Sequence, residues 1–332
     1  MKRKTNILMV ITAVVLMAGC EDFLEIRPEA TIPTTGTDYT KSENIFLSVS
    51  ASYASLRSYG AHVFPYIGAF EIASDNADKG STPEDNPPML EFDNLTYEAD
   101  NGLINDLWIA YYDIVSGANY SIHQMPLFEE ALLNSADKLY AMQCQGEVKT
   151  IRAYAYFNLT RLFGKVPIID TVLTADQLAS LSQASTAQLY DFIEQDLEEA
   201  IQVLLELTGR WPSLVMGNYW LGIACYHQGE YGASRKAFET LLQHSPESKI
   251  AHYHAALACF ADKAYERARD HLLVMVNEGY RDPQVYQLLG RVYRRLQRYP
   301  EAVETYKKGL ALNPDNGPLK LSLEDLTDVQ DP

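Results

Sequence analysis

One loop of the sequence brings aromatic rings close to amide and carboxylate side chains. Within ten residues the chain places Phe92, Asp93, Asn94, Tyr97 and Asn101. A flat ring can stack on the face of a sugar, and carboxylate and amide groups can hydrogen-bond its hydroxyls. We therefore expect these five residues to be candidates for a glycan contact. The alternative is that the rings anchor the loop on the protein core.

A second set of aromatic and basic side chains recurs at matching positions in the C-terminal third. Its members would line the first helices of three successive helix pairs: Tyr219, Ile223, Tyr226, Tyr253, Leu257, Phe260, Arg291 and Arg294. An aromatic groove that ends in two arginines suits an acidic or aromatic peptide segment. The alternative is that this face packs on the first half of the chain.

Catalytic motifs are absent from the sequence. It has no His-Glu-x-x-His, no Gly-x-Ser-x-Gly and no phosphate-binding glycine-rich loop. We therefore expect a binding protein with no catalytic residues, no cofactor and no bound metal ion. The formal net charge of −17 would repel a phosphate backbone, so nucleic acid is not an expected partner.

The N-terminus carries a processing signal. Three basic residues precede an apolar run from Ile7 to Ala18, which at ~1.5 Å per residue is too short to cross ~30 Å of hydrocarbon. This arrangement predicts a secretory signal peptide over residues 1–19. Its end, Leu16-Met17-Ala18-Gly19-Cys20, resembles a bacterial lipobox, in which Cys20 would be lipidated and become the first mature residue. The alternative is a plain signal peptide with an incidental cysteine.

Helical spacing of apolar residues predicts an all-α fold with long irregular insertions. After an extended tether over residues 20–40, we expect a helix between Ser42 and Gly60 with a buried stripe of Phe46, Val49, Tyr53 and Leu56. Residues 60–101 contain several Gly and Pro and are expected to be irregular. Further helices are expected over residues 103–125 and 135–163 and from Thr186 onward. Residues 41–210 form the predicted N-terminal domain.

Several side chains in these helices are expected to be structural. Arg152 lies on an otherwise apolar helix and cannot lose its charge, so we expect it to be buried with carboxylate or carbonyl partners. Trp108, Tyr111 and Tyr112 are expected to pack in the core, with sugar stacking as the alternative. The other cysteines are odd in number, which favours unpaired, buried thiols: Cys144, Cys225 and Cys259.

From about residue 215 the sequence repeats with a period of 34 residues. Equivalent positions hold Leu221-Gly222, Ala255-Ala256 and Leu289-Gly290; Tyr231, Tyr265 and Tyr299; and Phe238, Leu272 and Tyr306. Small residues let two helices approach closely, and the larger residues fill the space beside them. The pattern resembles the tetratricopeptide repeat and implies three repeats over residues 215–315 that form an α-solenoid. Residues 316–332 are expected to form a capping helix and an acidic tail.

The first half contains a stretch with an acidic residue, an apolar-Arg-Ala triplet, an aromatic-rich helix and a Phe-Gly-x-x-Pro turn. These are Glu147, Ile151-Arg152-Ala153 and Phe163-Gly164-Lys165-Val166-Pro167. The stretch resembles the SusD/RagB family. Cys20-Glu21-Asp22-Phe23-Leu24 resembles the mature start of that family, and residues 190–200 resemble its fourth helix. The resemblance covers residues 20–210 and implies a SusD-like helical scaffold.

The resemblance also implies a location and a function. Members of the family are lipid-anchored in the Bacteroidetes outer membrane and face the cell exterior. They bind glycans, oligosaccharides or peptides and deliver these nutrients to a SusC-like TonB-dependent transporter. Their large irregular C-terminal half supplies much of the ligand site, whereas regular repeats follow here. The alternative function is a lipid-anchored repeat scaffold for protein–protein interaction without glycan binding.

Overall fold

The computed structural model describes residues 36–74 and 77–327. The chain divides into two units, Met1–Asp38 and Tyr39–Pro332. The described residues form helices joined by turns and loops, with no strand among them, which confirms the predicted all-α class. The predicted signal peptide, Cys20, most of the predicted tether and the end of the acidic tail lie outside the described residues.

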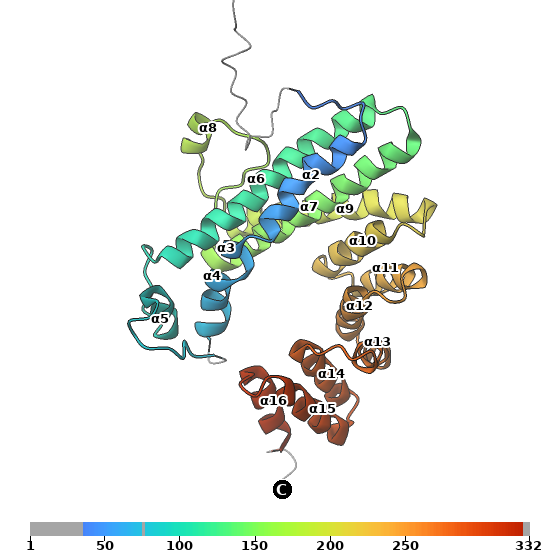
Figure 1. Ribbon diagram of the computed structural model, residues 1–332. Helices are drawn as coiled ribbons and strands as arrows, with labels where there is room; N and C mark the ends of the chain where they lie inside the picture. The colour runs from blue at the N-terminus through green and yellow to red at the C-terminus, as the bar shows by residue number, and fades with distance from the viewer. Residues whose placement is uncertain (1–35, 75–76, 328–332) are drawn as a thin grey trace, which may run out of the picture. The chain divides into compact units, whose positions relative to one another are not determined.

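Four long helices form the N-terminal part of the second unit. They are α2 (Glu43–Leu56), α6 (Gly102–Ala131), α7 (Ser135–Phe163) and α9 (Thr186–Arg210). α6 packs against both α2 and α7, and α7 packs against α9 (Figure 1). Apolar residues such as Leu107, Ile114 and Ile151 are buried between them. Within the described residues, no helix combines the length and the apolar character that a membrane crossing requires.

The bounds of α7 agree with the prediction, whereas α6 is longer than predicted. The side chain of Asn134 accepts a hydrogen bond from the first turn of α7, and Gly164 follows the helix at a φ of 72°. α6 continues past its predicted end at residue 125, through Pro126, to Ala131. The extension buries Phe128 in a cluster with residues of α2 and α7, and this burial offsets the hydrogen bond that proline cannot donate.

The buried face of α2 agrees with the predicted stripe except at Phe46. Val49 is buried and Tyr53 and Leu56 pack half-buried on the core, as predicted, whereas Phe46 is 58% exposed. The other buried residues of the helix are Ile45, Ser48 and Ser52. The hydroxyl of Ser52 lies 3.1 Å from that of Ser121 on α6, and a Cβ at Gly117 would lie 3.2 Å from the Ser52 nitrogen. α2 therefore turns its small residues toward α6, because only small residues allow this close approach.

The described residues between 59 and 93, predicted to be irregular, contain short helices. These are α3 (Tyr59–His62), α4 (Phe64–Ile67), a π-helical turn η1 (Gly68–Ile72) and α5 (Pro87–Asp93). A Cβ at Gly68 would lie 2.8 Å from the ring of Phe92, so glycine is required where η1 meets α5. Another short helix, α8 (Ala175–Ala179), begins with a capping box between α7 and α9.

Three helix pairs follow α9. They are α10 (Val215–His227) with α11 (Tyr231–His244), α12 (Lys249–Ala261) with α13 (Tyr265–Asn277), and α14 (Pro283–Arg295) with α15 (Tyr299–Leu312). Each pair packs on the next, and α10 also packs on α9. α16 (Gly317–Thr327), at the position of the predicted capping helix, packs against α14 and α15 (Figure 1).

In each helix pair, a small residue on the first helix faces a larger residue on the second helix. A Cβ at Gly222 would lie 2.6 Å from the ring of Phe238, and a Cβ at Gly290 would lie 2.1 Å from that of Tyr306. The middle pair has an alanine and Leu272 at the equivalent positions, and both are buried. Glycine therefore occurs where the facing residue is aromatic, and alanine occurs where the facing residue is leucine.

Arg152 of α7 joins several segments inside the first core. Its Nε and Nη2 donate to the two carboxylate oxygens of Asp196 on α9, both at 2.7 Å. Its Nη1 donates to Asn119 Oδ1 on α6 at 2.7 Å and to the carbonyl oxygen of Asp170 at 3.0 Å. The guanidinium also lies 5.0 Å from the centroid of the Phe192 ring. Arg152 is 5% exposed, which confirms the predicted buried, structural arginine.

Glu147 is a second buried polar residue with partners close by. Glu147 is 3% exposed, and its carboxylate accepts hydrogen bonds from Tyr53 and from Gln143. Burial raises the pKa of Glu147 to about 7, which leaves this carboxyl group partly protonated near neutral pH. The cysteines of the described part are unpaired and buried, as predicted.

Candidate functional site

The aromatic residues of the predicted glycan-contact loop divide into a buried one and an exposed one. Phe92 is 2% exposed and packs with Met89 and Leu103, so its ring cannot stack on a sugar. The structure thereby corrects the expectation for Phe92. Tyr97 is 44% exposed, and its ring centroid lies 5.1 Å from that of Phe92. Phe92 therefore anchors Tyr97 on the core and leaves Tyr97 as the accessible ring of this loop.

The polar residues of the same loop also divide. Asn101 is 4% exposed, and its Oδ1 accepts a hydrogen bond from the first turn of α6. Its Nδ2 donates to the carbonyl oxygen of Pro88 at 2.9 Å and to Glu91 Oε2 at 2.7 Å. Because these bonds engage both ends of its amide, Asn101 caps a helix rather than facing a ligand, which corrects its predicted role. Asp93 is half-buried and Asn94 is exposed.

A cavity of about 400 Å³ lies between α6 and the segment that follows α7. Its lining includes Trp108, Tyr112, Asp113 and Ser116 from α6, and Pro167, Thr171, Val172 and Leu178 from the segment. This volume is within the range of small-molecule sites, which are about 300–1,000 Å³. The cavity is therefore large enough to hold a small ligand.

Hydrogen bonds hold the two walls of this cavity together. The hydroxyl of Tyr112 donates to the carbonyl oxygen of Pro167 at 2.8 Å, and Asn119 Nδ2 donates to that of Ile169 at 2.8 Å. Trp108 is half-buried, and its ring centroid lies 4.8 Å from that of Tyr112. The sequence predicts core packing for these rings. They do pack together, but they also border a cavity that the sequence analysis missed.

Two exposed polar residues stand beside these aromatic rings. Asp113 and Ser116 lie on α6 at the cavity and are exposed. Partial burial raises the pKa of the Asp113 carboxyl group. An aromatic wall next to a carboxylate and a hydroxyl matches a sugar, whose ring face presents C–H groups and whose edge carries hydroxyls. Ser116 follows Tyr112 by four residues, and this helical spacing could have identified it, whereas no spacing rule connects Asp113 with Trp108.

A second cavity, of about 500 Å³, lies at the arginine end of the predicted repeat groove. It is lined by Phe260, Arg291 and Arg294 from the predicted set and by Arg295, Gln297 and Tyr299, which the sequence analysis missed. The guanidinium of Arg291 lies 5.0 Å from the centroid of the Phe260 ring. Arg294 forms an exposed ion pair with Asp325 of α16, with a nitrogen–oxygen distance of 3.5 Å.

The other predicted groove residues are half-buried and contribute to packing: Tyr219, Ile223, Tyr226, Tyr253 and Leu257. The ring of Tyr219 lies edge-on to those of Phe238 and His254. Tyr219 and Ile223 also line a cavity of about 260 Å³ together with Leu56 of α2 and Tyr154 of α7. The groove-facing residues of the first helix pair therefore pack on the first half of the chain, which is the alternative to an open groove.

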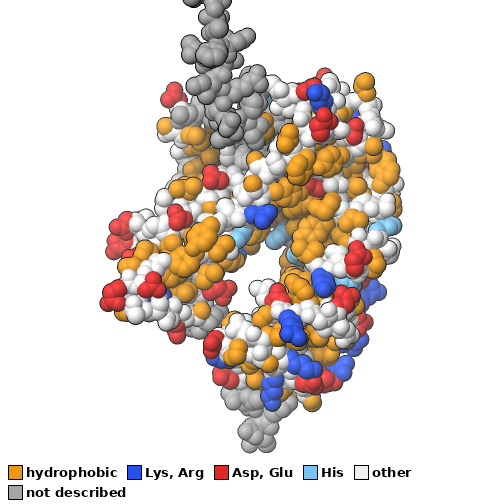
Figure 2. Space-filling view, viewed as in Figure 1, with side chains coloured by type: hydrophobic (Ala, Val, Ile, Leu, Met, Phe, Trp, Pro, Cys, Tyr) orange, Lys and Arg blue, Asp and Glu red, His pale blue; other side chains and the backbone are white. Residues whose placement is uncertain are grey.

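Charge is distributed unevenly along the chain. Residues 20–210 carry 29 Asp and Glu against 10 Lys and Arg, whereas residues 215–315 carry 11 against 13. On the face shown in Figure 2, basic side chains lie mostly over the repeats. α14 contains Arg291, Arg294 and Arg295 and no acidic residue. The second cavity is therefore the more favourable of the two for an anionic group.

Comparison with known proteins separates the same two parts. The SusD-like family model described as "Starch-binding associating with outer membrane" matches residues 22–209. Models of the tetratricopeptide repeat match residues 194–238, 228–284 and 283–316. The SusD-like model thus covers the four long helices, and the repeat models extend from within α9 to the end of α15.

Individual relatives align with the SusD-like part. Two SusD-like proteins of Formosa agariphila are 28% identical over 205 residues and 27% identical over 202 residues, which is 60% and 57% of this chain. The chain spans only 38% and 37% of the length of these relatives. A solved laminarin binding SusD-like protein is 25% identical, with a TM-score of 0.45 over 60% of this chain and 43% of its own. Because the family model matches more than half of the sequence, the chain belongs to the SusD-like family, and tetratricopeptide repeats follow its SusD-like part.

Proposed function

We propose that this chain is a lipid-anchored, nutrient-binding protein of the outer membrane that captures glycans outside the cell and delivers them to a SusC-like TonB-dependent transporter. Membership of the SusD-like family supports this proposal, because the family description names starch binding and association with the outer membrane. The lipobox-like segment ending at Cys20 supports the anchor. The protein acts by binding its ligand and carries out no catalytic step.

The cavity beside Trp108 is the observation that carries glycan capture. Tyr112 is held by its hydrogen bond to Pro167, and Trp108 packs against Tyr112 and Phe163, so little side-chain entropy is lost when a sugar stacks there. Asp113 and Ser116 lie where they can accept hydrogen bonds from hydroxyls at the rim. The exposed loop residues Asp93, Asn94 and Tyr97 provide a second candidate contact.

Substitutions in the cavity are expected to weaken glycan binding. A glycan array first identifies a ligand of the intact protein, and titration calorimetry then measures its affinity for each variant. Asp113→Ala should weaken that affinity by about 10-fold or more, since a hydrogen bond to a charged group contributes about 1.5–3 kcal/mol. Trp108→Leu should also weaken it, because it removes a flat ring on which the sugar stacks. Tyr97→Ala tests the loop in the same assay.

Tyr190→Ala is the matched control for Tyr97→Ala. Tyr190 is 39% exposed, similar to Tyr97, but it lies at the start of α9 and does not line the cavity. Its replacement should leave the affinity unchanged. A ligand bound equally well by the wild-type protein and by Trp108→Leu, Asp113→Ala and Tyr97→Ala would rule out both candidate contacts.

The anchor and the transporter are tested together in outer membranes. The wild-type chain should fractionate with the outer membrane and recover a TonB-dependent transporter in a pull-down after detergent extraction. Cys20→Ala should leave the membrane fraction, because it removes the atom to which the lipid would be attached. Recovery of other proteins with no such transporter would contradict the delivery role.

A protein-binding scaffold is the second candidate function. The cavity around Phe260, Arg291 and Arg294 favours it, since an aromatic ring with several guanidinium groups suits an acidic peptide segment. In the pull-down described above, loss of a recovered partner on Arg291→Ala, with glycan binding unchanged, would assign that partner to the repeats.

A further inference from the structure

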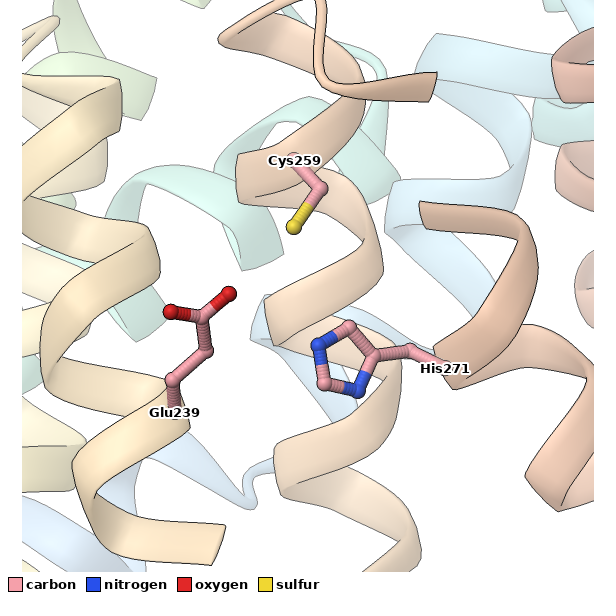
Figure 3. A group of neighbouring side chains, drawn as sticks. All are labelled: Glu239, Cys259 and His271. Atoms are coloured by element: carbon pink, nitrogen blue, oxygen red, sulfur yellow. The ribbon is translucent and has the colours of Figure 1, made fainter. Parts of the chain in front are cut away.

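Three side chains from three successive repeat helices meet at one point. Glu239 of α11, Cys259 of α12 and His271 of α13 point into the same space between these helices (Figure 3). One ligand atom of each residue lies within 4.8 Å of the others. Cys259 is fully buried, whereas Glu239 and His271 are half-buried. The side of the cluster at Cys259 is therefore shielded from solvent, whereas the side at Glu239 and His271 is accessible to an ion from solution.

Hydrogen bonds behind the cluster set the tautomer of His271. His252 Nε2 lies 3.0 Å from the carbonyl oxygen of Pro246, which can only accept, so this nitrogen carries a proton. With both rings neutral, His252 Nδ1 is then an acceptor, and His271 Nδ1, at 3.1 Å, donates to it. His271 Nε2 is left with a free lone pair. A histidine binds a metal ion through such a free lone pair. In metal sites its other ring nitrogen usually donates a hydrogen bond that fixes the tautomer and the orientation of the ring.

The carboxylate of the cluster is held in place by two arginines. Arg267 Nη1 donates to Glu239 Oε1 at 2.8 Å, and Arg235 Nη1 lies 3.2 Å from Oε2. Arg235 also donates from Nε to Asp262 at 3.0 Å, so part of its charge is neutralised elsewhere. A carboxylate has about four lone-pair positions, and these bonds leave room for a metal ion. The two arginines therefore orient the Glu239 carboxylate, but their positive charges lower its affinity for a cation.

We propose that Glu239, Cys259 and His271 bind a zinc ion that links the first and second repeats. One thiolate, one imidazole and one carboxylate are all zinc ligands, and the soft sulfur disfavours magnesium and calcium. Zinc bonds of about 2.0–2.3 Å require each ligand atom to shift by less than about 1 Å. Cys259 releases its thiol proton to solvent as the sulfur–zinc bond forms, and water fills the fourth position.

The cluster is particular to this junction and is not a consensus feature of the repeats. One period earlier, Cys225 recurs at the cysteine position, but Ala237 and Leu205 occupy the histidine and glutamate positions. One period later, the equivalents of Cys259 and His271 are Tyr293 and Thr305. Packing of the repeats therefore does not require this trio, because the neighbouring units pack without it.

Cobalt substitution tests the proposal on the full chain. The chelator-treated protein, with Cys20→Ala to remove the N-terminal thiol, is titrated with Co²⁺. One equivalent should produce a thiolate-to-cobalt charge-transfer band, which Zn²⁺ then abolishes by displacing the cobalt. The band should be lost in Cys259→Ser and in His271→Gln. His252→Gln should weaken the affinity about 10–100-fold, as is typical when the partner of a ligand is removed.

Cys225→Ser is the matched control, since it changes the same residue type one repeat away and should keep the band. Circular dichroism checks that each variant is folded. His271→Gln alters a half-buried side chain and serves if Cys259→Ser does not fold. The absence of a band in the parent protein, or its persistence in either ligand variant, would overturn the proposal.

Discussion

Asp196→Ala is expected to lower the free energy of unfolding by about 3–5 kcal/mol. Asp196 is 2% exposed and receives two hydrogen bonds from Arg152, which is itself 5% exposed. Removal of the carboxylate leaves a buried guanidinium without its counter-charge, and a guanidinium cannot escape this cost by losing a proton. Urea denaturation followed by circular dichroism measures the change.

Asp191→Ala is the control for this substitution. Asp191 lies on the same helix and is exposed, so its replacement should change the free energy of unfolding by less than about 0.5 kcal/mol. The double variant Arg152→Met with Asp196→Leu should recover much of the loss, because it removes both buried charges together. A cost for Asp196→Ala below about 1 kcal/mol would show that water reaches Arg152 in the folded protein.

Gly290→Ala is expected to lower the free energy of unfolding by about 3 kcal/mol or more. The added Cβ would lie 2.1 Å from Cε1 of Tyr306, a distance that requires the helices or the ring to move. Tyr306 is fully buried, so the ring has no open space to enter. Overpacking of this kind costs about 1–3 kcal/mol or more. Thermal and urea unfolding of the full chain measure the loss.

A second substitution should restore much of this stability. Gly290→Ala with Tyr306→Leu recreates the combination of Ala256 and Leu272 found one repeat earlier. The two changes should therefore couple strongly in a double-mutant cycle. Gly232→Ala is the control, because its added Cβ would make only an ordinary contact, 3.7 Å from Asp262 Oδ1. This change should stabilise α11 by up to about 1 kcal/mol, since alanine favours a helix more than glycine does. If the effects of Gly290→Ala and Tyr306→Leu on the free energy of unfolding were additive, the two residues would not be matched in packing.

Local sequence patterns determine much of the fold. The helix from Ser135 to Phe163 has an asparagine cap, apolar residues at helical spacing and a glycine at its end, and each of these signals acts over a few residues. The repeats are equally readable, since equivalent residues recur every 34 positions. The buried role of Arg152 was predictable because a permanent charge on an apolar helix needs partners.

Tertiary packing decides which face of an element is used. The spacing in α2 allows two apolar faces, and the close approach to Gly117 and Ser121 of α6 selects the one with small residues, leaving Phe46 exposed. The burial of Phe92 follows likewise from the absence of a side chain at Gly68 in η1. Neither partner is adjacent in sequence, so periodicity alone could not choose.

By itself, the sequence determined the long helices, the repeats and the resemblance to the SusD-like family, and it predicts the lipid-anchor segment. All of these depend on residues close together in the chain or on a fixed period. Only the tertiary structure decided where chemistry can occur. It joins Trp108 to Thr171 around one cavity and Glu239 to His271 at one point. Such sites form between helices whose separation in sequence carries no periodic signal, and their geometry is set by how the helices pack.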